Sequence, residues 1–141
     1  MPQAVEFFRN HPLLIMAFIG IVMGLVWTFV AGRAQGVARL APSDVTRLIN
    51  SEDAVVIDVR SDGEFRQGHI INAINVPESQ IASADSTLAK HRGDPVITVC
   101  RTGQLSARAG AALKRAGFER VHTLAGGLLA WESASLPLSK K

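Results

Sequence analysis

Apolar residues form one long uninterrupted run near the N-terminus. Residues 12–32 contain no charged side chain, and the nearest charges on either side are Arg9 and Arg33. A helix of about 20 apolar residues spans the hydrocarbon core of a bilayer, which is roughly 30 Å thick. We therefore expect one transmembrane helix over residues 12–32, preceded by an N-terminal tail of residues 1–11.

A cleaved signal peptide is the alternative interpretation of this run. Its apolar region is typically about 7–15 residues long and is followed by a cleavage site of the A-x-A type. The run in this chain is longer, and no A-x-A precedes Arg33. The pattern therefore favours a retained membrane anchor in the lipid bilayer.

Basic residues around the run predict its orientation. Arg9 precedes the expected span, whereas Arg33, Arg39 and Arg47 follow it. Loops rich in Lys and Arg stay on the cytoplasmic side, so the C-terminal part is expected to face the cytoplasm. Gly20 and Gly24 form a G-x-x-x-G spacing, which is either chance in a glycine-tolerant helix or a face for a helix-mediated homodimer.

Beyond a short polar linker, residues 33–36, strand-like apolar runs alternate with helix-like stripes up to residue 137. Continuous apolar runs are typical of strands buried on both faces of a parallel sheet. The pattern predicts an α/β domain over residues 37–137, with a mainly parallel five-stranded sheet flanked by helices and a basic tail at 138–141. The expected strands are 37–40, 54–59, 74–76, 95–100 and 121–124, and the expected helices are 42–50, 86–91, 106–116 and 127–133.

Composition narrows the classes of function. Of the 141 residues, 48% are hydrophobic and 19% are charged, which fits a packed domain and not a disordered chain. The net charge of +3 is too small and too scattered for a nucleic-acid-binding surface. The one cysteine cannot form an internal disulfide, and a free thiol survives best in a reducing compartment.

That cysteine, Cys100, lies where a buried strand ends and the turn C-R-T-G-Q leads into a helix. Such a turn points backbone N–H groups inward, and the helix adds a positive dipole end. These groups stabilise a thiolate and lower the pKa of a thiol below its free value of about 8.5. An inert core thiol is the alternative. Ile97 and Val99 can already fill the core, which favours a reactive Cys100.

Four segments occur in an order and spacing that resemble the signature segments of rhodanese-like (sulfurtransferase) domains. They are V-I-D-V-R at 56–60, E-F-R-Q-G-H-I-I-N-A-I-N-V-P at 64–77, V-I-T-V-C-R-T-G-Q-L-S-A at 96–107 and L-A-G-G-L-L-A-W at 124–131. The likeness covers residues 37–137. An anchor followed by one such domain resembles a group of bacterial membrane-bound proteins of this family, which implies a single-pass protein of the inner membrane.

The resemblance implies sulfur transfer through a persulfide on Cys100, without a metal or an organic cofactor. Sulfur comes from a donor such as thiosulfate or a persulfide and passes to a thiol or to cyanide. Asp58 and Arg60, at the end of another strand, are expected to support the loop. The expected substrate-binding residues are Arg101, Thr102, Gly103, Gln104, Leu105 and Ser106.

One loop position departs from the family pattern. Many active relatives carry Arg, Ser or Thr at the sixth position of the loop, where this chain has Leu105. We expect weak activity with thiosulfate or a preference for a protein persulfide. The other hypothesis is a catalytically inactive rhodanese-fold module that binds a membrane-protein partner. Phosphatase activity is not expected, because the C-x5-R arginine is replaced by Ser106 and the next arginine is Arg108.

The remaining polar residues have structural and functional interpretations. Asp58 either orients the loop or caps local N–H groups. Arg60 is expected to pair with Glu64, although a substrate role stays open. His69 is either architectural or a general base. Structural roles alone are expected for His122, Trp131 and the glycine pair at 126–127.

Overall fold

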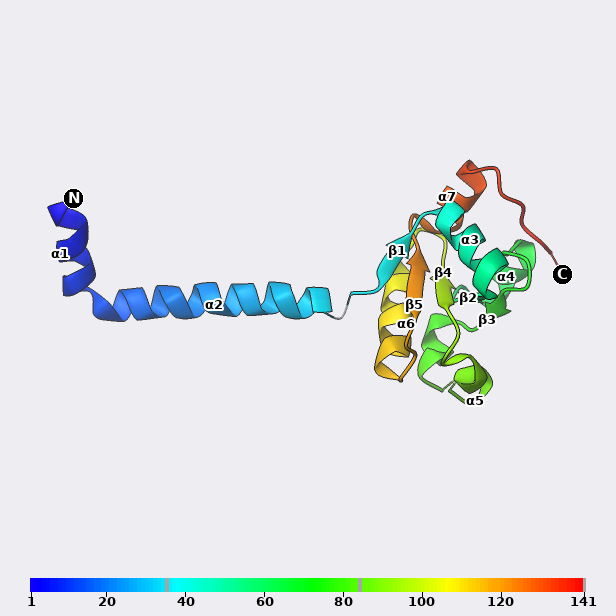
Figure 1. Ribbon diagram of the computed structural model, residues 1–141, viewed down its shortest axis with the longest axis horizontal. Coiled ribbons are helices and arrows are strands. Elements are labelled where there is room, and N and C mark those ends of the chain that lie inside the picture. Colours follow the sequence, from blue (N-terminus) through cyan, green and yellow to red (C-terminus); the bar gives the residue numbers. More distant parts are fainter. Residues whose placement is uncertain (35, 84, 141) are drawn as a thin grey trace. The chain divides into compact units, whose positions relative to one another are not determined.

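The computed structural model describes residues 1–34, 36–83 and 85–140, and it divides into two compact units, Met1–Gly36 and Val37–Lys141 (Figure 1). The predicted linker, 33–36, includes Gln35, which lies outside the described residues. Lys141 of the predicted tail also lies outside them.

The N-terminal unit consists of two helices, α1 (Pro2–Asn10) and α2 (Pro12–Ala34). In α2 the window Pro12–Ala31 has a mean hydropathy of 2.6, and none of it is buried. The expected long apolar helix is thus confirmed as one that is long and apolar enough to cross a membrane. Helix α1 falls in the segment that the sequence pattern left as a tail.

The second unit is built on a five-stranded sheet in the order β1-β5-β4-β2-β3, with every pair parallel. The predicted α/β class and five-stranded sheet are confirmed. The apolar runs form strands because side chains on both faces of a parallel sheet are covered by helices. The strands are β1 (Ala38–Leu40), β2 (Val55–Asp58), β3 (Ile74–Asn75), β4 (Val96–Val99) and β5 (Val121–Leu124).

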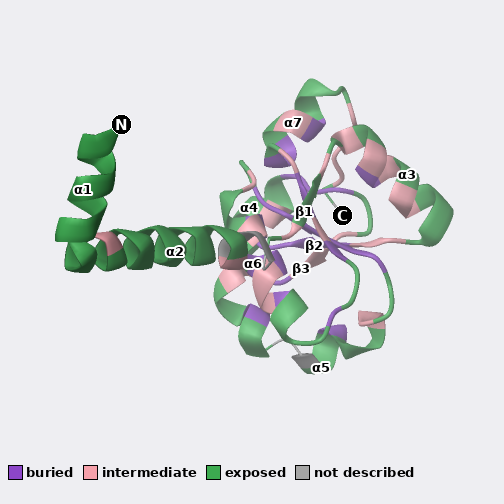
Figure 2. Cartoon of the chain, turned by 60° about the vertical axis from the view of Figure 1, so that its left-hand side comes forward, coloured by how far each residue is buried: buried purple, intermediate pink, exposed green. Residues whose placement is uncertain are grey.

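Helices cover both faces of this sheet (Figure 2). The buried side chains form two clusters, one on each face. On one face α6 (Gln104–Arg115) packs with the 3₁₀ helix η1 (Glu78–Ser83) and with α5 (Asp85–Leu88). The other face carries α3 (Pro42–Glu52) and α7 (Gly127–Ser133). The smaller elements are α4 (Asp62–Gln67) and η2 (Ala89–His91).

Helix α4 was not expected from the sequence, because its six residues are exposed or half-buried and form no apolar stripe. Its start does carry a local signal. The Ser61 hydroxyl accepts a hydrogen bond from the Glu64 N–H, as in an N-terminal capping box. Helix α6 also differs from expectation, since it begins at Gln104, two residues before the predicted start.

Strand register brings two polar segments to one edge of the sheet. Asp58 at the end of β2 pairs with Val99 at the end of β4. The Val59 N–H donates to the Val99 carbonyl at 2.9 Å, so the segments that follow β2 and β4 leave the sheet side by side. Arg60 and Cys100 therefore follow neighbouring strands, at the edge where sites form in parallel sheets.

Beyond Pro137 the chain stays attached to the domain. Leu138 packs against the core on the α3 and α7 face. Ser139 and His69 form an antiparallel bridge, in which the His69 N–H donates to the Ser139 carbonyl at 2.8 Å.

Candidate active site

Cys100 lies at the carboxyl end of β4, with only 1% of its surface exposed. The turn that follows is short, because Gly103 already caps α6 with φ at 100°. A left-handed φ strains most other residues, so glycine suits this position. The sulfur is therefore buried directly in front of the N-terminus of a twelve-residue helix.

The carbonyl groups of the loop are held by the start of α7. The Leu128 N–H donates to the Cys100 carbonyl at 2.9 Å, and the Leu129 N–H donates to the Arg101 carbonyl at 3.2 Å. This approach needs a glycine at position 127, where an added Cβ would lie 2.4 Å from the Arg101 oxygen. The Thr102 N–H, which shares a peptide group with the Arg101 carbonyl, points the other way and is one of the backbone donors to Cys100. Gly127 thus has a structural role, as expected for the glycine pair at 126–127.

The sulfur receives several hydrogen bonds. The Gly103 N–H donates to Sγ at 2.9 Å, and the Ser106 hydroxyl lies 3.4 Å from Sγ. Burial by itself raises the pKa of the Cys100 thiol. Hydrogen bonds from the Ser106 hydroxyl and from the backbone of Ser106, Gly103 and Thr102 outweigh burial, so the pKa lies below its ordinary value. A thiol held in this way ionises readily and is a nucleophile.

Buried threonines behind Ser106 were not expected from the sequence. The Thr123 hydroxyl donates to the Ser106 hydroxyl at 2.7 Å, and the Thr98 hydroxyl donates to the Ser106 carbonyl at 2.8 Å. All three residues are fully or almost fully buried. The Thr98 carbonyl also lies within reach of the Thr123 hydroxyl, at 3.2 Å, and when that hydroxyl donates to Ser106 instead, the Ser106 proton can point to Gly103 O or to a Cys100 thiolate. The threonines thus hold the hydroxyl beside the sulfur.

The other expected loop residues occupy the rim. Arg101, Thr102 and Gln104 are exposed, and Leu105 in the first turn of α6 keeps 37% of its surface exposed. Ser106 lies in the interior, so its partner is the sulfur and not the solvent.

A shallow cavity of about 210 Å³ adjoins the loop at Arg101. Arg60 lines it as well, so the structure brings these two arginines from neighbouring strand ends to one cavity. Leu129 and Glu132 of α7 form another part of its wall.

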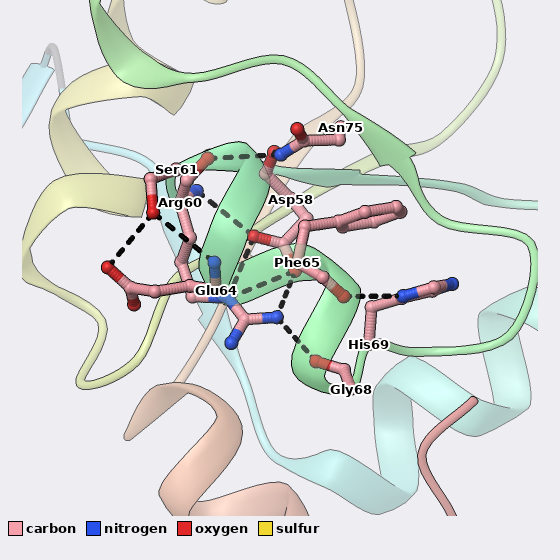
Figure 3. A network of polar contacts seen from close by, with 8 residues as sticks. All are labelled: Asp58, Arg60, Ser61, Glu64, Phe65, Gly68, His69 and Asn75. Atoms are coloured by element: carbon pink, nitrogen blue, oxygen red, sulfur yellow. Dashed lines mark hydrogen bonds and ion pairs between the residues drawn. The ribbon is translucent and has the colours of Figure 1, made fainter. Parts of the chain in front are cut away.

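Arg60, which lines this cavity, forms an ion pair with the buried Asp58 (Figure 3). Arg60 Nη2 donates to Asp58 Oδ2 and to the Gly68 carbonyl, both at 2.7 Å. Asp58 Oδ1 also accepts from the Arg60 N–H, which is the local capping role. The expected pairing of Arg60 with Glu64 is wrong, because Glu64 turns to Ser61 at the start of α4 while Arg60 folds back on Asp58.

The remaining singled-out residues take structural positions. His69 stacks on Phe65 at 3.8 Å, and its Nδ1 donates to the Phe65 carbonyl at 2.8 Å. Trp131 is buried and donates to the Pro137 carbonyl. His122 is half-buried, its Nδ1 has no hydrogen-bond partner among the described residues, and burial together with Arg120 lowers its pKa. Within residues 1–34, 36–83 and 85–140, no group of His, Cys, Asp and Glu is placed to hold a metal ion.

Comparison with known proteins places this site in a family. Residues 41–134 match the Rhodanese-like domain, so the chain belongs to the rhodanese-like family. It is 37% identical over 139 residues to the uncharacterized protein YibN of Escherichia coli K12, covering 98% of this chain and 97% of that protein.

Two further relatives match the second unit. A sulfurtransferase of Allochromatium vinosum is 37% identical over 92 residues, which cover 65% of this chain and 84% of that protein. The crystal structure of a rhodanese-related protein from Thermoplasma volcanium superimposes with a TM-score of 0.66 at 26% identity, covering 74% of this chain and 99% of that one.

The contact at Gly127 yields a first prediction. We expect Gly127→Ala to destabilise the domain by roughly 1–3 kcal/mol and to slow alkylation of Cys100, because the new methyl group displaces α7 from the loop. Gly117→Ala is the matched control, since Gly117 also has a positive φ but an added Cβ would meet no described atom within 4 Å. Urea unfolding and iodoacetamide kinetics measure both effects. Equal slowing of alkylation in the two variants would contradict the role of this contact.

The hydroxyl contacts yield a second prediction. Ser106→Ala removes a donor to the thiolate, so the pKa of Cys100 rises and its alkylation rate at pH 7 falls by about tenfold. Thr123→Val acts in the same direction but less, because it acts through Ser106. At high pH, where Cys100 is ionised in the wild type and in both variants, the alkylation rates of the variants should stay near that of the wild type. A pH profile that keeps its midpoint in Ser106→Ala would show that the hydroxyl does not tune the thiol.

Proposed function

We propose that this protein is a membrane-anchored sulfurtransferase or persulfide carrier, with Cys100 as the nucleophile. The observation that supports it most is the set of donors around Sγ, which are the Gly103 N–H, the Ser106 hydroxyl and the N-terminus of α6. Membership of a family that includes sulfurtransferases supports the same chemistry. An array of fixed donors stabilises negative charge on sulfur without reorganising during the reaction.

The proposed reaction has two half-reactions. In the first, the Cys100 thiolate attacks the outer sulfur of thiosulfate, a new S–S bond forms at Sγ, and the S–S bond of thiosulfate breaks. Sulfite leaves with the bonding electron pair. In the second, a thiolate or cyanide attacks the outer sulfur of the persulfide, and Cys100 leaves again as the thiolate. No net oxidation and no cofactor are needed.

The residues at the rim of the loop influence which sulfur donor binds. Leu105 offers no hydrogen bond to an anion, whereas Arg101 is exposed beside the adjoining cavity. Arg60 is already committed to Asp58 and Gly68. Among the described residues that line this cavity, Arg101 is therefore the one guanidinium without an ion-pair partner, so thiosulfate is expected to bind weakly and a persulfide donor is expected to be preferred.

Helix α2 supports attachment of this domain to a membrane. We expect it to be retained as a single-pass anchor in the bacterial inner membrane, with the domain in the cytoplasm. A dimer through Gly20 and Gly24, or a membrane-protein partner, stays a prediction.

Turnover with several donors tests the proposed function. After subtraction of the protein-free rate, full-length protein in detergent should form thiocyanate from cyanide and a persulfide donor faster than from thiosulfate, and Cys100→Ser should add nothing to the protein-free rate. Activity that survives in Cys100→Ser would overturn the assignment of the nucleophile. A wild-type protein inactive with every donor would favour the membrane-tethered interaction module.

The rim yields a third prediction. We expect Leu105→Arg to lower the KM for thiosulfate by about tenfold, because a hydrogen bond to a charged group contributes roughly 1.5–3 kcal/mol. Leu105→Met, which keeps the volume and adds no charge, should leave the KM unchanged. Equal KM values in the two variants would show that the sixth loop position does not contact the donor.

A further inference from the structure

Helix α1 has two chemically distinct faces. Successive residues of a helix are 100° apart, so Ala4, Phe7 and Phe8 gather on one side together with Val5. The opposite side carries the polar residues Gln3, Glu6, Arg9 and Asn10.

Every residue of α1 is exposed, including Val5 at 68%, Phe7 at 53% and Phe8 at 59%. An isolated helix shorter than about 12 residues is only marginally stable in water, and most helical stability comes from packing an apolar face. A nine-residue helix with an apolar face therefore needs a surface to cover that face.

The neighbouring helix indicates what that surface is. Apolar side chains of α2 are exposed on all sides, as shown by Leu13, Ile19, Leu25 and Val30, which fits a surrounding of hydrocarbon. Helix α1 is apolar on one side only, which fits a boundary between hydrocarbon and water. The exposed apolar surface continues from one helix to the next within the same unit.

The junction between the helices turns the chain. Pro12 starts α2, and Figure 1 shows α1 turned away from the α2 axis. The His11 N–H donates to the Phe7 carbonyl at 3.1 Å, and the Phe7 and His11 rings lie 4.8 Å apart. Helix α1 therefore does not continue along the axis of α2, and it adds no length to the expected membrane-spanning helix.

From these observations we infer that α1 is an interfacial helix whose apolar face lies in the bilayer surface, with Phe7 and Phe8 among the lipid chains and Arg9 near the headgroups. The inference rests on the proposed membrane anchoring by α2. Such a helix is buried about 5–10 Å into the boundary region, and it would fix the depth at which α2 enters the bilayer.

Cysteine accessibility in the full-length chain tests this inference. In a Cys100→Ser background, single substitutions are made at residues 3–10, and membranes opened by freeze–thaw are treated with a charged, water-soluble maleimide. We expect Gln3→Cys, Glu6→Cys and Asn10→Cys to react about tenfold faster than Val5→Cys and Phe8→Cys. Liposomes holding only the purified protein at low density should show the same alternation.

Each alternative has its own outcome. Equal reactivity at all positions in carbonate-resistant membranes would overturn the interfacial helix while leaving the anchor intact. Release of the chain by carbonate would overturn the anchor as well. If Val5→Cys and Phe8→Cys react slowly with the maleimide in membranes but rapidly in the liposomes, a protein partner covers the apolar face. If Phe8→Cys forms disulfide-linked dimers at low density, a second copy of the chain covers it. Either result would overturn the lipid surface as the occupant.

Discussion

The geometry around Cys100 depends on two hydrogen bonds from the start of α7. The N–H groups of Leu128 and Leu129 hold the carbonyls of Cys100 and Arg101. They reach these carbonyls only because Gly127 has no side chain. In a trans peptide group the carbonyl and the N–H point in opposite directions, so the Arg101 carbonyl that faces α7 turns the Thr102 N–H away from α7, and Thr102 is one of the backbone donors that stabilise the thiolate. The L-A-G-G segment thus helps to position the loop of a cysteine that lies more than twenty residues away along the chain.

The balance at the sulfur follows from that arrangement. Burial raises the pKa of the Cys100 thiol, but hydrogen bonds from the loop and from Ser106 lower it by more, so the net shift of the pKa is downward. The positive end of α6 acts in the same direction. A compact loop of this kind suits a single sulfur with its attached group, and Ser106 occupies the position where a phosphate-binding loop would carry arginine. These features support the proposed transfer of sulfur.

Much of the fold could be predicted because parallel strands are continuous apolar runs. Residues 54–59 and 95–100 were expected as buried strands and form β2 and β4. Helix α4 could not be found by apolar periodicity, since it buries no stripe, although its capping serine and glutamate were visible in the sequence.

Contacts between distant elements were harder to predict than the strands. The serine at position 106 belonged to the expected loop, but its support by Thr123 depends on the register of β4 with β5, which places Thr98 opposite Thr123. Arg60 was expected to reach forward to Glu64, and instead it folds back on Asp58 where β2 ends. The Thr123 contact depends on strand register, which local spacing does not reveal. The Arg60 contact is local, and the sequence offered both Asp58 and Glu64 as nearby carboxylates without deciding between them.

The proposed sulfur transfer depends on Cys100 being held as a thiolate that accepts sulfur. This step can be followed by the intact mass of the full-length protein after a persulfide donor and again after dithiothreitol, with Cys100→Ser alongside. We expect a gain of one sulfur atom that dithiothreitol removes and that the serine variant never shows. A wild-type protein that gains no sulfur from either a persulfide donor or thiosulfate would contradict it.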